Sequence, residues 1–156
     1  MLKFLFVCTG NTCRSPMAEA IFKHEAELAG LSLEVTASSA GTQAIPGEKA
    51  SEQARHLLMA EGIDDLDSHS ARRISHEMAD DVDIILAMTD GHRSQLISLF
   101  PRLRSRIFLL KEYAGTVDDN LDVDDPLGQG AEKYRRVLED IRICIKKIML
   151  KLKEGH

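Results

Sequence analysis

The sequence predicts an α/β fold: a three-layer open sheet of four parallel strands with helices on both faces. The first observation is that short apolar runs alternate with helical patterns along the 156 residues, as expected for a parallel sheet. The second is that the first apolar run leads through a tight loop directly into a helix. A strand, loop and helix in this order offer unpaired backbone N–H groups to an anion, so we expect a phosphate-binding loop after strand 1.

The first strand and helix are the most clearly patterned part of the chain. Residues 2–7 are almost wholly apolar, which suits a central strand covered on both faces. We expect Ser15 to cap the following helix, Pro16 to occupy its first position and Glu19 to complete the cap. Gly30 should end this helix. Its predicted apolar stripe consists of Met17, Ala20, Ile21, His24 and Leu28.

The remaining elements follow from apolar periodicity and from glycine and proline positions. Between residues 68 and 81 we expect a loop with one short helix, and the acidic segment 116–130 should be a long loop. Such loops in small domains are often functional. The predicted strands are 33–37, 82–88 and 106–110, and the predicted helices are 50–62, 90–100 and 131–153.

Length and composition limit the class of protein. The chain of 156 residues, with 44% hydrophobic and 29% charged residues, suits one globular domain over residues 1–156. A net charge of −5 argues against nucleic acid as a partner, and no apolar run is long enough to cross a membrane. Three cysteines, an odd number, and no secretion signal favour reduced thiols and a cytoplasmic location.

The loop CTGNTCRS carries most of the chemistry. A cysteine such as Cys8, taken alone, is more often a small buried hydrophobic residue than a nucleophile. The five residues between Cys8 and Arg14, however, can wrap one tetrahedral oxyanion, and Gly10 permits close backbone approach. The planar guanidinium of Arg14 can hold two phosphate oxygens, and together with the loop N–H groups it favours a thiolate. The Ser15 hydroxyl is either a further donor to this site or only a helix cap.

Attack on phosphorus also needs a general acid, because a phenoxide or guanidine leaving group departs far better when protonated. The acidic loop offers several candidates, and most such residues are simply solvated. We single out Asp125 because Pro126 restricts its backbone to extended geometry and so fixes its direction. The candidates are Asp118, Asp119, Asp122, Asp124 and Asp125.

With CTGNTCRS near the N-terminus and Asp125-Pro126 near the other end, the chain resembles the low-molecular-weight protein tyrosine phosphatase family over its whole length. The resemblance implies that Cys8 is the nucleophile, that Arg14 clamps the phosphate, and that Asp125 acts first as acid and then as base toward water. The phosphate is then carried transiently on Cys8, with no metal and no cofactor.

The resemblance also assigns the supporting residues. Asn11, Ser15, Ser39 and His69 are expected to form a hydrogen-bond network that shapes the loop. A reversible disulfide between Cys8 and Cys13 is a further possibility that the family suggests, against the alternative of a packed thiol. The expected phosphate-binding loop comprises Thr9, Gly10, Asn11, Thr12, Cys13 and Ser15.

Two positions bear on the substrate. Tyrosine-selective members of the family often have isoleucine where this chain has Thr12, and aromatic residues where it has Leu127. Without those rings the pocket lacks walls to sandwich a phenyl group, and a hydroxyl at position 12 suits a polar guanidinium and a water. The sequence is similar here to the bacterial protein arginine phosphatase branch. We therefore favour phosphoarginine over phosphotyrosine, while Thr12 as a tolerated β-branched substitute stays open.

Other functions on the same scaffold fit less well. A thiol-redox arsenate reductase needs resolving cysteines beyond the loop, and Cys144 lies on the apolar stripe of the last helix. A phosphocysteine carrier is disfavoured because Asp125 would activate water and discharge it. No second cysteine or histidine pair has the spacing of a metal site. The expected partners are phosphorylated proteins as substrates, and the expected state is a monomer or weak dimer, with neither nucleic acid nor membrane.

Overall fold

The sheet is built around its first strand. The computed structural model describes residues 1–155, and in it four strands pair in the order β2-β1-β3-β4. Every pair is parallel, as predicted. The strands are β1 (Leu2–Cys8), β2 (Val35–Gly41), β3 (Ile84–Ala87) and β4 (Ile107–Leu109).

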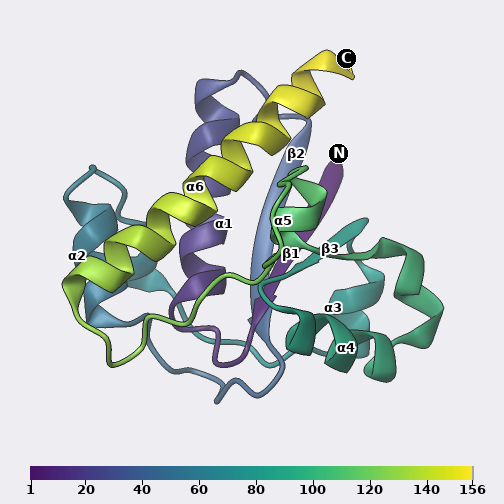
Figure 1. Ribbon diagram of the computed structural model, residues 1–156, viewed down its shortest axis with the longest axis horizontal. Helices are drawn as coiled ribbons and strands as arrows, with labels where there is room; N and C mark the ends of the chain where they lie inside the picture. Colours follow the sequence, from purple (N-terminus) through teal and green to yellow (C-terminus); the bar gives the residue numbers. More distant parts are fainter. Residues whose placement is uncertain (156) are drawn as a thin grey trace.

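Helices cover both faces of the sheet, which confirms the three-layer architecture (Figure 1). On one side Phe4 and Phe6 of β1 join the core formed with the first and last helices. On the other side Leu5 and Val7 join a smaller core. The first side holds α1 (Arg14–Leu28), α2 (Glu52–Met59), α5 (Leu110–Tyr113), α6 (Ala131–Glu154) and the 3-10 turn η1 (Asp65–Ser68), and the second holds α3 (His76–Asp80), α4 (Asp90–Leu99) and the 3-10 turn η2 (Pro101–Arg106).

The second strand differs from its predicted range of 33–37. It begins at Val35, leaving Leu33 88% exposed, and continues through small residues to Gly41. The cause is the pairing with β1, in which Leu2 lies opposite Val35 and Cys8 opposite Gly41. Ladder hydrogen bonds along the whole of β1 outweigh the low strand propensity of serine, alanine and glycine. Strands β3 and β4 are each shorter than predicted by one or two residues at each end; Arg106 belongs to η2 and Leu110 to α5.

The predicted start of the first helix was wrong. Helix α1 begins at Arg14, its N-cap position is Cys13, and no side chain caps it. Ser15 therefore lies inside the first turn, and neither Ser15 nor Glu19 has the predicted capping role. Both side chains instead bond to the loop and to β2.

The predicted apolar stripe of α1 was correct only in part. Met17, Ala20 and Ile21 are buried, but Leu28 is 70% exposed, and Phe22 and Ala26 are buried in its place. Helix α1 lies between the sheet and α6, so it is covered on more than one side (Figure 1). A single stripe therefore underestimates its buried surface.

The acidic segment after α5 has the irregular structure expected of it, and α6 begins at Ala131 as predicted. Helix α5 and the two 3-10 turns were not predicted, because each is too short to show periodicity. Within residues 1–155 no helix is long and apolar enough to span a membrane.

Candidate active site

The loop between β1 and α1 lies where the sheet topology places a ligand site. From β1 the chain crosses to β2 on one side, and β3 pairs on the other, so the strand order reverses at the carboxyl end of β1. Ligands of open α/β sheets bind at this kind of switch point. Cys8 is the last residue of β1 and Arg14 is the first of α1, so the loop spans this point directly (Figure 1).

Cys8 lies against the side chain of Ser15. Its Sγ is 2.9 Å from Ser15 Oγ, and both residues are buried. Ser15 Oγ also accepts a hydrogen bond of 2.9 Å from the side-chain amide of Asn11. Its own proton is then free for one of two acceptors, Cys8 Sγ or the carbonyl of Ala40 at 3.4 Å. The shorter contact suits donation to a thiolate, which a hydroxyl hydrogen bond stabilises.

Asn11 has the one backbone conformation in the loop that most residues avoid. Its φ is +55°, and it is fully buried. The side-chain amide donates to Ser15 Oγ at 2.9 Å and to Ser39 Oγ at 3.0 Å. Its Oδ1 accepts the backbone N–H of Arg72 at 2.9 Å, and its carbonyl accepts from Nε2 of His69 at 2.7 Å. The four residues expected to form a network do lie together, and Arg72 joins them.

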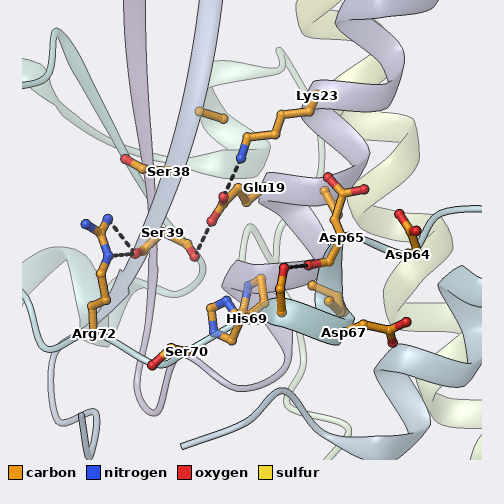
Figure 2. Close-up of a pocket in the computed structure, with 15 residues that line it drawn as sticks. Glu19, Lys23, Ser38, Ser39, Asp64, Asp65, Asp67, His69, Ser70 and Arg72 are labelled. Carbon is orange, nitrogen blue, oxygen red and sulfur yellow. Dashed lines mark hydrogen bonds and ion pairs between the residues drawn. The ribbon is translucent and has the colours of Figure 1, made fainter. Parts of the chain in front are cut away.

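Figure 2 shows this support from the side that faces a cavity of about 720 Å³. Ser39 Oγ donates to Glu19 Oε1 at 2.7 Å, and Glu19 Oε2 pairs with Lys23 one turn further along α1. The guanidinium of Arg72 donates to the carbonyl of Ser39 at 3.1 and 3.3 Å. Sequence reasoning missed Glu19, which it placed in a cap, and Arg72, whose Arg-Arg context gave no signal of a backbone contact.

Arg14 brings the two distant parts of the site together. Its guanidinium is buried, donates at 3.0 Å to the carbonyl of Val123 and lies 3.7 Å from Asp125 Oδ2. Asp125 is half-exposed, and its Oδ1 accepts the backbone N–H of Leu127 at 3.1 Å. The carboxylate is thus held beside the guanidinium at the mouth of the loop.

The other acids of the long loop have different partners. Asp124 pairs with Lys133 of α6 at 2.7 Å, and this hydrogen bond holds the pKa of Asp124 below its usual range. Asp122 Oδ1 accepts the backbone N–H of Asp90 at the start of α4. Asp118 and Asp119 are exposed. Among the five candidate acids, Asp125 is the one that the structure pairs with Arg14.

Cys13 and Cys144 are buried thiols. Burial raises the pKa of Cys13 to about 12, and the Cys8 side chain adds to the shift. Tyr134 of α6, which the sequence placed only on an apolar stripe, has a small opposing effect on the pKa of Cys13. Cys144 is buried in the core, as predicted. All three cysteines are free, and within residues 1–155 no group of three histidine, cysteine or acidic side chains is placed to hold a metal ion.

His92 is a buried residue beside the loop that the sequence did not indicate as part of the site. It lies in the first turn of α4, is 6% exposed, and its Nε2 is 2.7 Å from Thr9 Oγ1. Burial, and to a smaller extent the charge of Arg14, lower the pKa of His92 to about 4, while Asp122 and Asp125 act in the opposite direction. A lone histidine in a helix carries no pattern that a sequence could show.

Two glycines near the loop have different roles. An added methyl group on Gly10 would make only an ordinary contact, 3.7 Å from Thr12 Oγ1, so the protein itself does not demand glycine there. At Gly41 it would overlap the carbonyl oxygen of Thr9 and lie 2.9 Å from the backbone nitrogen of Asn11. The end of β2 must therefore be glycine for the loop to pack on it.

The fold and this loop define the class of the protein. Residues 3–156 match the model of the low molecular weight phosphotyrosine protein phosphatase family. The chain belongs to this family and is a cysteine-dependent phosphatase.

Individual relatives cover the whole chain. A protein-arginine-phosphatase of Bacillus subtilis (strain 168) is 37% identical over 155 residues, 99% of each chain. The low molecular weight protein-tyrosine-phosphatase PtpB of Staphylococcus epidermidis is 35% identical over 150 residues, 96% of this chain and 99% of that protein. A solved structure of YwlE arginine phosphatase, a mutant with a phosphorylated active-site serine, has a TM-score of 0.90 at 37% identity and covers 97% of this chain and 96% of that one.

The contact of Gly41 with the loop gives a first prediction. Gly41→Ala should lower the free energy of unfolding by about 1–3 kcal/mol, as overpacking does, and should lower phosphatase activity because the loop must shift. Denaturant unfolding and aryl phosphate hydrolysis measure the two effects. Gly91→Ala, where the new methyl group makes only ordinary contacts, is the matched control. Its free energy of unfolding should be at least that of the wild type. Equal behaviour of the two variants would contradict the steric argument.

The lowered pKa of His92 predicts a pH dependence. As the pH falls below about 6.5, the unfolded chain takes up a proton at this position before the folded protein does. The free energy of unfolding therefore decreases as the pH falls. Relative to His92→Gln, the unfolding free energy of the wild type should fall by about 3 kcal/mol between pH about 7 and about 4. Denaturant titrations of both proteins across this range give the difference. Parallel pH profiles would show that His92 titrates normally.

Proposed function

We propose that Cys8, Arg14 and Asp125 carry the reaction of this phosphatase on phosphorylated protein side chains. The observation that supports this most is the position of Arg14, which is buried in the first turn of α1 and lies 3.7 Å from the Asp125 carboxylate. Phosphate held by Arg14 therefore has the thiol of the loop on one side and an acid on the other.

In the first half-reaction the Cys8 thiolate attacks phosphorus, and the bond from phosphorus to the leaving group breaks. Asp125 gives its proton to the leaving nitrogen of an arginine, or to the leaving oxygen of a tyrosine. Ser15 donates a hydrogen bond to Cys8 Sγ and so favours the thiolate. Arg14 and the loop N–H groups hold the equatorial oxygens.

In the second half-reaction water hydrolyses the phosphocysteine. Asp125, now a carboxylate, takes a proton from the water as it attacks phosphorus, and Cys8 leaves as a thiolate. Inorganic phosphate departs and Asp125 is again protonated. The relative with a phosphorylated active-site serine supports a covalent intermediate of this kind at the equivalent position.

Phosphoarginine is the substrate that we propose. Thr12 presents its hydroxyl on the side of the loop near Gly10, and Leu127, at the rim beside Asp125, is 65% exposed and not aromatic. A polar guanidinium can donate a hydrogen bond to the hydroxyl oxygen, while a phenyl ring finds no ring to stack on. The similarity to the protein-arginine-phosphatase of Bacillus subtilis supports phosphoarginine. The similarity to the tyrosine phosphatase PtpB makes phosphotyrosine the second candidate substrate.

The competing functions remain less well supported. Arsenate reduction would need a further accessible cysteine, and Cys144 lies on the buried face of α6. A carrier of phosphate would have to keep water from the phosphocysteine, yet Asp125 is half-exposed beside it.

The proposed setting follows from the same chemistry. We propose a cytoplasmic enzyme that acts as a single domain, as a monomer or weak dimer, on phosphorylated proteins. Three free thiols suit a reducing compartment, in which Cys8 stays active. A regulatory Cys8–Cys13 disulfide stays a prediction: with a pKa of about 12 Cys13 is a thiol, so oxidation would have to begin at Cys8.

The assignment of Asp125 predicts a dependence on the leaving group. Asp125→Ala should slow release of a poorly leaving alkyl or guanidine group by about 100-fold or more, since general acids contribute about that much. An activated aryl phosphate, which needs little protonation, should lose far less. Single-turnover and steady-state rates with both substrates test this, with the exposed Asp119→Ala as the matched acidic control and Cys8→Ser as the inactive control. Equal losses with both leaving groups would refute the acid role.

The role of Thr12 predicts a change of substrate. Thr12→Ile should lower kcat/KM for a phosphoarginine peptide by about tenfold, the loss expected for one hydrogen bond, and raise the relative rate on a phosphotyrosine peptide. Thr12→Ser keeps the hydroxyl and should keep the preference. A wild type that prefers phosphotyrosine, together with an unchanged ratio in Thr12→Ile, would show that the arginine assignment is wrong.

A further inference from the structure

His92 connects the first turn of α4 to the residue that follows Cys8. Its imidazole is buried, and each ring nitrogen has one partner. Nε2 is 2.7 Å from Thr9 Oγ1 and Nδ1 is 3.0 Å from Thr89 Oγ1. Thr9 and Thr89 follow the two neighbouring parallel strands β1 and β3, so the ring bridges the carboxyl ends of both.

The bonding pattern suits a neutral imidazole ring. Thr89 Oγ1 caps α4 by accepting the backbone N–H of His92 at 3.2 Å, and it still has its own proton to donate. With this proton directed at Nδ1, Nε2–H donates to Thr9 Oγ1; in the other tautomer Nδ1–H donates to Thr89 Oγ1 and the Thr9 hydroxyl donates to Nε2. Either arrangement satisfies every polar group of the bridge with a neutral imidazole.

The same turn of α4 also holds the acid loop. The backbone N–H of Asp90 donates to Asp122 Oδ1 at 2.8 Å. The next residue, Val123, donates its N–H to the carbonyl of Met88 at 2.8 Å and accepts from Arg14 at 3.0 Å. Residues 88–92 therefore contact the segment that carries Asp125 as well as the loop that carries Cys8.

Thr9 is held from two directions. On the β2 side its carbonyl accepts the backbone N–H of Gln43 at 2.9 Å, and the carbonyl of Cys8 accepts that of Thr42 at 2.9 Å. On the α4 side its hydroxyl is hydrogen-bonded to Nε2 of His92. The main-chain bonds remain if the bond to His92 is lost, so the fold does not depend on it.

We propose that His92 is a positioning residue for the phosphatase reaction: through Thr9 it fixes the nucleophile loop relative to the acid loop. This rests on the proposed function of Cys8 and Asp125. His92 does not contact Cys8 in this scheme and transfers no proton. With a pKa of about 4, set by burial and Arg14 against Asp122 and Asp125, it stays neutral at the pH of a cytoplasmic enzyme and adds no charge to the phosphate site.

Two amide replacements separate this role from simple packing. The polar atom of asparagine reaches the position of Nδ1, and that of glutamine reaches the position of Nε2. His92→Asn can therefore keep the contact with Thr89 but not the one with Thr9, whereas His92→Gln can donate to Thr9. Thr9→Val removes the same bond from the other side with little change of volume.

The test measures kcat and KM for aryl phosphate hydrolysis in His92→Asn, Thr9→Val and the double variant. Each single change should lower kcat by about tenfold, the equivalent of one hydrogen bond, with a smaller effect on KM. The double variant should be no worse than either single one, because both remove one bond. His92→Gln should restore most of the loss. The control is His76→Asn in α3. The His76 ring packs on Phe100, and its replacement should not affect kcat.

Binding of inorganic phosphate, measured by calorimetry, is the second readout and needs no turnover. His92→Asn and Thr9→Val should weaken it to the same extent and without additivity. Multiplicative losses in the double variant, wild-type rates in His92→Asn, or no rescue by His92→Gln would overturn the proposal. If His92→Asn does not fold, Thr9→Val against wild type decides, since an unchanged rate there also overturns it. A wild type that binds phosphate but hydrolyses no phosphate ester would instead refute the proposed function.

Discussion

The phosphate-binding loop depends on one buried asparagine held in a left-handed conformation. Asn11 has φ of +55°, which costs a residue other than glycine about 1 kcal/mol or more. Four hydrogen bonds with Ser15, Ser39, Arg72 and His69 offset this cost. Because asparagine is neutral and uses both its donors and its acceptor here, the loop is fixed without adding a charge that would compete with phosphate.

This constraint explains the position of several other elements. Strand β2 must extend as far as Gly41 for Ser39 to reach Asn11, and Gly41 must lack a side chain for Thr9 to approach. The segment after η1 must run beside the loop for His69 and Arg72 to bind it. Support of the loop is thus distributed over segments far apart in the sequence, each contributing one or two bonds.

The sequence predicted the parts of this arrangement that depend on local spacing. The apolar runs indicate the parallel sheet, and the five residues between Cys8 and Arg14 by themselves indicate an anion-binding loop. Prediction failed where tertiary contacts overrule local preference. Ser15 has the residue type of a helix cap but lies inside α1, because its hydroxyl serves Cys8 and Asn11. Among five acids of one loop, Pro126 singled out Asp125 in the sequence, and the structure pairs that residue with Arg14. His92 has no local signal at all.

The two halves of the site differ in one of their attachments. Neutral hydrogen bonds between buried groups fix the loop around Asn11, while the segment before Asp125 is attached to α6 by the ion pair of Asp124 and Lys133, at the protein surface. Dissolved salt screens an exposed ion pair and leaves buried neutral bonds almost unchanged. Ionic strength therefore weakens the surface attachment of the acid loop, which the main-chain bonds of Val123 to Met88 and Arg14 still hold. The cradle for phosphate keeps its shape.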